Sequence, residues 1–192
     1  MIIAIADQCG TCGKAIGETL ALLRARSGRT VLVIDADSPH SPGAGSSERF
    51  PGFGPRVPRH AITAGRLSAE LEQFIPQYQD IVIETDGRDA PARAALIAAR
   101  LVIVPIHSEQ ADLACHYALI ARLNSARMFN PGLHVMFVIA AGCVAPSSAD
   151  LLEIRAYVAQ VMSATLCATV IHASASPASD EIAALYREVF PG

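Results

Sequence analysis

The sequence predicts a three-layer α/β domain that is doubly wound around a mainly parallel β-sheet. Short apolar runs recur along the chain, and they are nearly continuous in apolar character, as in parallel strands that are covered on both faces. Amphipathic helical patterns lie between these runs. This alternation of strands and helices is typical of parallel sheets with right-handed crossovers.

The individual elements follow from these two patterns. The apolar runs predict strands at residues 2–6, 30–34, 81–84, 101–106, 134–140 and 168–171. The helices between them are marked by apolar residues at helical spacing: Ile16, Leu20 and Leu23; Leu113, Tyr117 and Ile120; Leu151, Ile154, Val158 and Val161; and Ile182, Leu185 and Val189.

One segment departs from the alternation. Residues 38–60 are rich in proline and glycine, which predicts a long loop without regular structure. Loops of this length in compact domains are usually functional or mobile. No internal repeat or linker divides the chain, so we expect residues 1–192 to form a single domain.

Composition excludes several classes of protein. Of the 192 residues, 52% are hydrophobic and 17% are charged, which excludes a disordered chain. The net charge of -3 gives no overall attraction to nucleic acid or anionic lipid. No apolar run is long enough to span a bilayer, and the N-terminus lacks the features of a signal peptide. Five cysteines, mostly in apolar segments, fit reduced thiols, so we expect a cytoplasmic protein without membrane contact.

The segment "IAIADQCGTCGKAIGETLALL", residues 3–23, carries the main functional signal. A strand, a glycine-containing turn, Gly13-Lys14 and a helix follow one another, which is the layout of a phosphate-binding loop. Lys14 is the only lysine in the sequence, although the chain has 15 basic residues. The same turn contains Cys9 and Cys12, so a thiol or metal function of this Cys-x-x-Cys pair is the alternative.

Histidine spacing gives no further metal motif. None of the six histidines has the H-x-x-x-H or H-E-x-x-H spacing of a zinc site. His107 follows a predicted strand, at the edge where ligands of α/β sheets bind, but we interpret it as a polar residue at a strand end.

Four motifs in order resemble the ParA/MinD family of deviant Walker A ATPases. Residues 9–16 align with the family's K-G-G-x-G-K-[ST]-[ST] loop. "GRTVLVIDADSPHS" is similar to the second strand and switch I, "DIVIETDG" to the Walker B strand, and "ARLVIVPIHSEQADL" to the strand that follows. The resemblance covers roughly residues 1–125 and implies a P-loop NTPase-like fold.

The resemblance also implies a nucleotide site. It assigns the binding of ATP or ADP to the loop residues Gly10, Thr11, Cys12, Gly13, Lys14, Ala15 and Ile16. Lys14 and Asp37 take the catalytic positions, and Asp35 and Glu84 take the positions that face Mg²⁺.

Several family residues are replaced in this sequence. Cys9 stands where the family has its signature lysine, which reaches the partner subunit's nucleotide, and Thr11 replaces a glycine. Ala15 lacks the hydroxyl that coordinates Mg²⁺, and Glu84 replaces an aspartate. Losing a transition-state charge clamp costs ~10³-fold or more in related phosphoryl transfers. We therefore expect ATP hydrolysis to be weak or lost.

The expected function is that of a ParA/MinD-like partition or positioning protein. The resemblance implies a homodimer with a centromere-binding protein or cargo adaptor as its partner, and nonspecific contact with DNA. Two alternatives remain open. One is a non-enzymatic scaffold or regulator that retains the P-loop fold, and the other is a thiol or metal-binding protein that uses Cys9 and Cys12.

Overall fold

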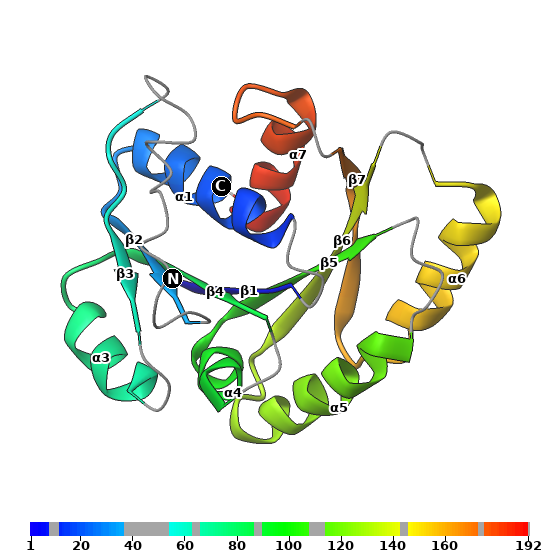
Figure 1. Ribbon diagram of the computed structural model, residues 1–192, viewed down its shortest axis with the longest axis horizontal. Coiled ribbons are helices and arrows are strands. Elements are labelled where there is room, and N and C mark those ends of the chain that lie inside the picture. The colour runs from blue at the N-terminus through cyan, green and yellow to red at the C-terminus, as the bar shows by residue number, and fades with distance from the viewer. Residues whose placement is uncertain are drawn as a thin grey trace.

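The computed structural model describes residues 1–7, 12–36, 54–62, 66–86, 90–107, 114–142, 146–172 and 175–191. Within these residues, seven strands form one sheet in the order β3-β2-β4-β1-β5-β6-β7 (Figure 1). All neighbouring strands are parallel. The strands are β1 (Ile2–Ala6), β2 (Val31–Asp35), β3 (Arg59–Ala61), β4 (Asp80–Thr85), β5 (Leu101–His107), β6 (His134–Ala141) and β7 (Ala164–His172).

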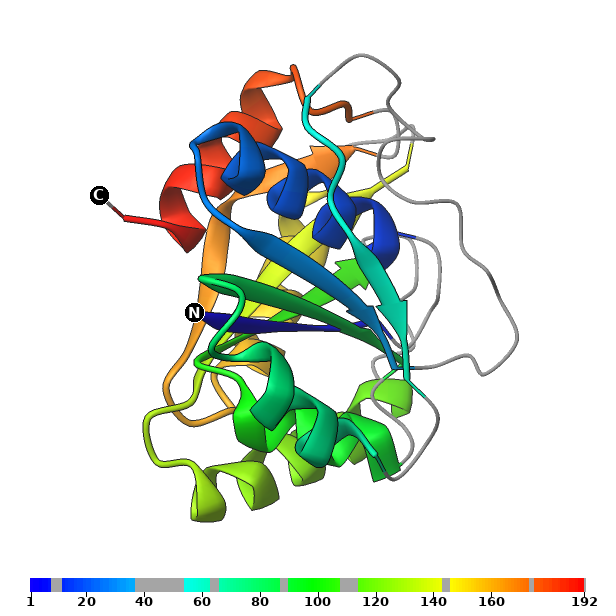
Figure 2. The same ribbon diagram turned by 90° about the vertical axis from the view of Figure 1, so that its left-hand side faces the viewer.

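Helices cover both faces of the sheet (Figures 1 and 2). One face carries α1 (Gly13–Arg26) and α7 (Asp180–Val189). The other carries α3 (Leu67–Phe74), α4 (Ala90–Ala98), α5 (Ala114–Phe129) and α6 (Ser148–Val158). The predicted three-layer α/β fold with a parallel sheet is therefore confirmed. In the part of the chain that is described, no helix is both long and apolar enough to cross a membrane.

Two hydrophobic cores lie on opposite faces of the sheet, and the central strand β1 contributes to both. Ile3 and Ile5 pack under α1 and α7, whereas Ala4 and Ala6 face the core formed with α3 to α6. Successive side chains of a strand point to opposite faces, so burial on both sides removes the polar positions of a half-exposed strand. This is why β1 is continuously apolar.

The prediction of a structureless loop at residues 38–60 was wrong at its C-terminal end. Arg59 and His60 belong to β3, which pairs with β2 at the edge of the sheet. The strand has only three residues, and none of them is fully buried, so it lacks the apolar pattern by which a buried strand is recognised. Residues 38–53 of the predicted loop lie outside the described ranges.

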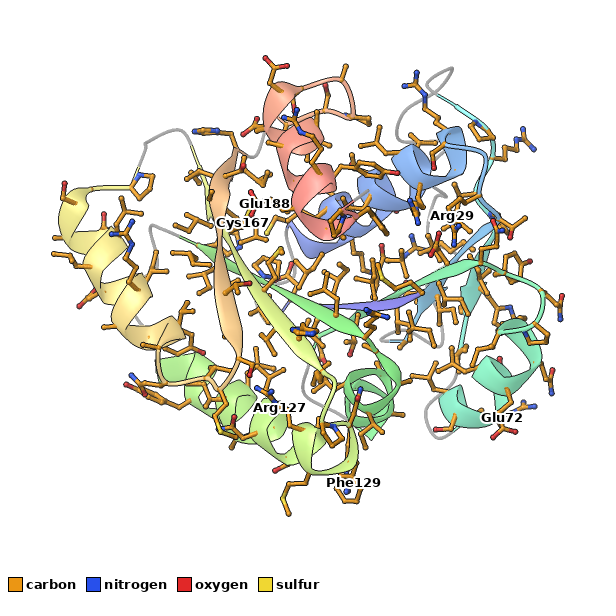
Figure 3. All side chains as sticks on the ribbon, turned by 180° about the vertical axis from the view of Figure 1, so that it is seen from behind. Arg29, Glu72, Arg127, Phe129, Cys167 and Glu188 are labelled. Atoms are coloured by element: carbon orange, nitrogen blue, oxygen red, sulfur yellow. The ribbon has the colours of Figure 1, made fainter. Side chains whose placement is uncertain are left out.

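The last strand is also longer than predicted. β7 begins at Ala164 rather than at residue 168, and most of its residues are partly or fully exposed because it forms the other edge of the sheet. The middle of β7 is joined to α7 through Cys167, whose thiol donates a hydrogen bond to Glu188 Oε1 at 3.2 Å (Figure 3).

The helices α3 and α4 were not predicted from the sequence pattern.

A buried carboxylate at the start of β4 joins this strand to the end of α1. Asp80 Oδ2 accepts hydrogen bonds from Arg24 Nε at 2.8 Å and from Arg29 Nε at 2.6 Å. Burial alone raises the pKa of Asp80, but hydrogen bonds from Arg29, the Met1 amino group and Arg24 outweigh it, so the pKa lies below its ordinary value of 3.8. Because the folded-state pKa is lowered, ionised Asp80 stabilises the fold above that value, and this contribution is lost as the pH falls.

We expect Asp80→Asn to lower the free energy of unfolding by about 2 kcal/mol near neutral pH, because both arginines lose their counter-ion but remain partly hydrated. Urea unfolding followed by circular dichroism measures the change. Asp180→Asn, on the exposed first turn of α7, is the control and should change stability little. Equal effects of the two substitutions would contradict the role of Asp80.

Candidate functional site

The candidate site lies where β1, β2 and β4 end and α1 begins. Asp7 directly follows β1, Asp35 ends β2, and Glu84 is the second-last residue of β4. Asp35 and Glu84 are partners in the β2–β4 register, so their side chains leave the same face of the sheet at the same level. Polar side chains therefore gather at the carboxyl ends of the strands, where ligands of open α/β sheets bind.

Asp7 occupies the N-terminus of α1. Its Oδ2 accepts hydrogen bonds from the backbone N–H groups of Gly13 at 2.7 Å and of Cys12 at 3.2 Å. The helix approaches Asp7 so closely that a Cβ atom at Gly13 would lie 2.4 Å from Asp7 Cβ, so glycine is required there. A carboxylate of the chain itself thus takes the N–H groups that a P-loop offers to phosphate.

Lys14 points toward the acidic residues of the sheet. Its Nζ lies 3.3 Å from Asp35 Oδ2, and its side chain is 43% exposed. The lysine that the sequence assigned to phosphate is therefore close to solvent but paired with a carboxylate that is nearly fully buried.

Arg59 connects three buried acids. Its guanidinium donates to Glu18 Oε1 at 2.8 Å, to Asp35 Oδ2 at 3.1 Å and also to Glu84 Oε2. The Arg59 side chain is 12% exposed and comes from β3, the strand that was predicted to be loop. Glu18 comes from α1, one helical turn after Lys14. Sheet and helix thus place three carboxylates around one guanidinium.

The ionisation of Glu84 is strongly altered by its surroundings. Burial raises its pKa from 4.5 to about 8; Arg59 opposes this shift, whereas Glu18 and Asp35 add to it by charge repulsion. Among the described atoms, Glu84 Oε1 is buried without a hydrogen-bond partner. The raised pKa of Glu84 reduces the negative charge that the cluster buries near neutral pH.

These residues do not fit a Mg²⁺–nucleotide complex in their present arrangement. Mg²⁺ requires near-octahedral oxygen ligands, but Asp35 and Glu84 are held by the Arg59 guanidinium, and Ala15 offers no hydroxyl. On the phosphate side, Asp7 already accepts the N–H bonds of Cys12 and Gly13. The Asp7 carboxylate thus occupies the position of a phosphate, and the Arg59 guanidinium occupies the position of a metal ion.

The predicted site residues are only partly covered by the structure. Residues 12–16 lie at the start of α1. Gly10, Thr11, Cys9 and Asp37 lie outside the described residues, so their assigned roles stay predictions. Sequence analysis missed Asp7, Glu18 and Arg59. Two of them could have been found from their position in the sequence: Asp7 directly follows the first strand, and Glu18 is four residues after Lys14. Arg59 could not, because it lies in the segment that was predicted to be a loop.

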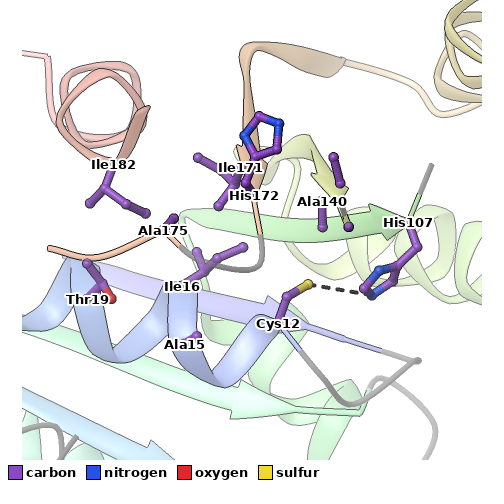
Figure 4. Close-up of a pocket in the computed structure, with 12 residues that line it drawn as sticks. Cys12, Ala15, Ile16, Thr19, His107, Ala140, Ile171, His172, Ala175 and Ile182 are labelled. Carbon is purple, nitrogen blue, oxygen red and sulfur yellow. Dashed lines mark hydrogen bonds between the residues drawn. The ribbon is translucent and has the colours of Figure 1, made fainter. Parts of the chain in front are cut away.

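A cavity of about 160 Å³ lies beside the start of α1, toward β5, β6 and β7 (Figure 4). Its wall is mostly apolar and includes Ile16, Ile171 and Ile182. Cys12 and His107 lie together at one end of it, with 3.6 Å between Cys12 Sγ and His107 Nε2. The cavity is therefore mostly apolar, unlike the cluster of charged side chains around Arg59.

Known structures share this architecture. No protein-family model and no curated protein sequence matches the chain. Among solved structures, it is similar to cobyrinic acid a,c-diamide synthase from Mycobacterium smegmatis with bound ADP and magnesium, at a TM-score of 0.68 and 17% identity over 97% of this chain and 91% of that chain. It is also similar to a plasmid partition protein from Borrelia burgdorferi, at a TM-score of 0.62 and 16% identity over 98% and 95% of the two chains.

A further neighbour is a putative plasmid partition protein from Borrelia burgdorferi bound to AMPPNP, with a TM-score of 0.60 and 15% identity over 98% of this chain and 95% of that chain. The chain has a ParA/MinD-like P-loop fold. The predicted fold class is thus confirmed over 97% to 98% of the chain, beyond the roughly 125 residues in which the motifs were found.

We expect the stability of the protein to fall as the pH rises from about 4.5 to about 8, because folded Glu84 keeps its proton to about pH 8 whereas the unfolded chain releases it near 4.5. One proton corresponds to a slope of at most ~1.4 kcal/mol per pH unit. Glu84→Gln should flatten this slope, since the amide is neutral throughout. Urea unfolding at pH 5 to 9 compares the two proteins, and parallel pH profiles would contradict the raised pKa.

Proposed function

We propose that this protein is a ParA/MinD-like partition or positioning protein that acts in DNA segregation or cargo positioning without hydrolysing ATP. The role in partition or positioning is supported by the similarity to the plasmid partition proteins from Borrelia burgdorferi, because each match covers nearly the whole of this chain and of the matched chain. The absence of ATP hydrolysis is supported by the arrangement of the charged residues around Arg59.

The observation that carries the loss of hydrolysis is the position of Arg59. P-loop NTPases use Mg²⁺ to bridge the β- and γ-phosphates and to neutralise the charge that develops there. In this chain the two acids in the metal-facing positions, Asp35 and Glu84, both accept hydrogen bonds from Arg59. Arginine stays protonated at any physiological pH, so the guanidinium cannot leave these acids by losing its charge.

Nucleotide binding is weak for a related reason. An incoming phosphate has to displace the Asp7 carboxylate from the N–H groups of Cys12 and Gly13. It also has to draw Lys14 away from Asp35. Both steps break charge-assisted contacts, each of which is worth ~1.5–3 kcal/mol. The protein therefore acts by binding rather than by turnover.

The partners that fit this role are a second copy of the chain, a centromere-binding protein or cargo adaptor, and DNA bound without sequence preference. The net charge of -3 makes contact with DNA depend on local arginines rather than on the overall field. A non-enzymatic scaffold or regulator outside DNA segregation is the second candidate, favoured by the same engagement of Asp35 and Glu84 with Arg59.

Hydrolysis is tested by phosphate release from MgATP. We expect wild type and Lys14→Ala to release phosphate equally, at the background rate, because the metal-facing acids are occupied. Calorimetry should find ATP and ADP binding no tighter than millimolar. If Lys14 contacted the phosphates, its removal would weaken binding by ~10- to 150-fold. Faster release by wild type than by Lys14→Ala would overturn the loss of hydrolysis.

The role in partition is tested in the cell. Deletion of the gene should raise the loss rate of the replicon that carries it. A Lys14→Ala allele should restore retention, since binding without turnover is sufficient. Unchanged retention after deletion would contradict partition and favour the scaffold. Restoration by wild type alone would show that the phosphate-binding lysine is needed after all.

A further inference from the structure

An aspartate, a cysteine and a histidine side chain, all of types that bind metal ions, lie close together at the carboxyl ends of β1 and β5, where α1 begins. Asp7, Cys12 and His107 each place a ligand atom within 4.8 Å of the others. Asp7 is buried, and the other two side chains are half-buried. We propose that these three residues bind a divalent transition-metal ion, with Zn²⁺ as the preferred ion. The site does not depend on the proposed role in partition.

The distance between sulfur and nitrogen fits a shared metal ion. Cys12 Sγ and His107 Nε2 are 3.6 Å apart. A thiolate sulfur at ~2.3 Å and an imidazole nitrogen at ~2.0–2.1 Å from a tetrahedral Zn²⁺ are separated by about 3.6 Å. The separation of these two atoms therefore matches that of two ligands on one ion. The carboxylate oxygen has to approach these two atoms by at most about 1.4 Å to reach the separation of ligands on one ion.

Among the described residues, hydrogen bonds orient one of the ligands, and a cavity adjoins the other two. The N–H groups of Cys12 and Gly13 hold the Asp7 carboxylate, as outer-shell hydrogen bonds hold the ligands of known metal sites. Cys12 and His107 both line the cavity of about 160 Å³. Three protein ligands with one position open to water or a small molecule are typical of catalytic zinc sites.

The donor set and the charge select the kind of ion. A site with one sulfur, one nitrogen and one oxygen ligand favours Zn²⁺ and its transition-metal neighbours over Mg²⁺ or Ca²⁺, which prefer oxygen alone. The positive end of a helix dipole disfavours a bare cation. Here the ionised Cys12 and Asp7 carry two negative charges, so the complex with a divalent ion is neutral.

This site differs from the Cys9–Cys12 pair that the sequence suggested. His107 is 95 residues away from Cys12 in the sequence, so no spacing motif connects them. The two sites make different demands: the proposed one requires His107, whereas a Cys-x-x-Cys site requires Cys9 and not His107.

The test uses untagged, reduced protein that has been freed of metal with a chelator. Calorimetric titration with Zn²⁺ should show one ion per chain. Co²⁺ should give a thiolate-to-cobalt absorption band in wild type. We expect Cys12→Ser and His107→Ala each to weaken Zn²⁺ binding by at least ~100-fold, and Asp7→Asn by at least ~10-fold, because removing a ligand costs no less than removing an outer-shell partner.

Two variants serve as matched controls. His172→Ala removes another histidine that lines the same cavity but bonds to Glu181. Cys167→Ser removes the buried thiol on β7, whose pKa is raised to about 11, chiefly by burial. Both should bind Zn²⁺ like wild type.

Three outcomes would overturn the proposal. The first is that wild type binds neither Zn²⁺ nor Co²⁺. The second is a cobalt spectrum of wild type without a thiolate band, a result that does not depend on how any variant folds. The third is that His107→Ala keeps full Zn²⁺ affinity while Cys9→Ala loses it, which would assign the metal to the Cys-x-x-Cys pair.

Discussion

The carboxyl edge of the sheet depends on one guanidinium. Burying Glu18, Asp35 and Glu84 next to one another is unfavourable unless their charge is compensated. Arg59 provides that compensation and in doing so connects α1, β2 and β4 with the edge strand β3. The pKa of Glu84 also rises to about 8 in this setting, first through burial and then through the neighbouring acids, and this reduces the negative charge that has to be compensated. The short strand β3 is thus held by charge as well as by its pairing with β2.

Side chains of the protein itself occupy both parts of the region that the resemblance assigns to a nucleotide. At the start of α1, Asp7 takes the backbone N–H groups that would cradle a phosphate. At the ends of β2 and β4, Arg59 takes the acids that would hold a metal ion. The fold thereby keeps the electrostatic pattern of a P-loop protein, an anion at the helix N-terminus and a cation at the strand ends, with its own side chains. The ParA/MinD-like fold is thus compatible with the proposed loss of ATP turnover.

The central strand β1 separates two environments. On the β4 side lie the charged residues around Arg59, and on the β5 side lies the apolar cavity with Cys12 and His107 at its end. Chain order reverses across β1, so its C-terminal end is the switch point at which open α/β sheets form a crevice. Asp7, at this end, serves both sides: it orders the start of α1 and stands within reach of the thiol and the imidazole.

The sequence by itself determined the layers and most of the strands. Burial on both faces makes parallel strands continuously apolar, a pattern that a single sequence displays, and the motifs from residue 3 to residue 125 were enough to predict the P-loop fold. The resemblance to the ParA/MinD family also assigned Lys14, Asp35 and Glu84 to one site. What it could not show was how these residues are paired. Arg59 reaches them from a strand too short and too polar to be recognised, and His107 meets Cys12 through the order of strands in the sheet. Periodicity along the chain reports burial, whereas contacts between distant polar groups arise only when the strands are arranged side by side, so the tertiary structure alone decided which charges, thiol and imidazole face one another.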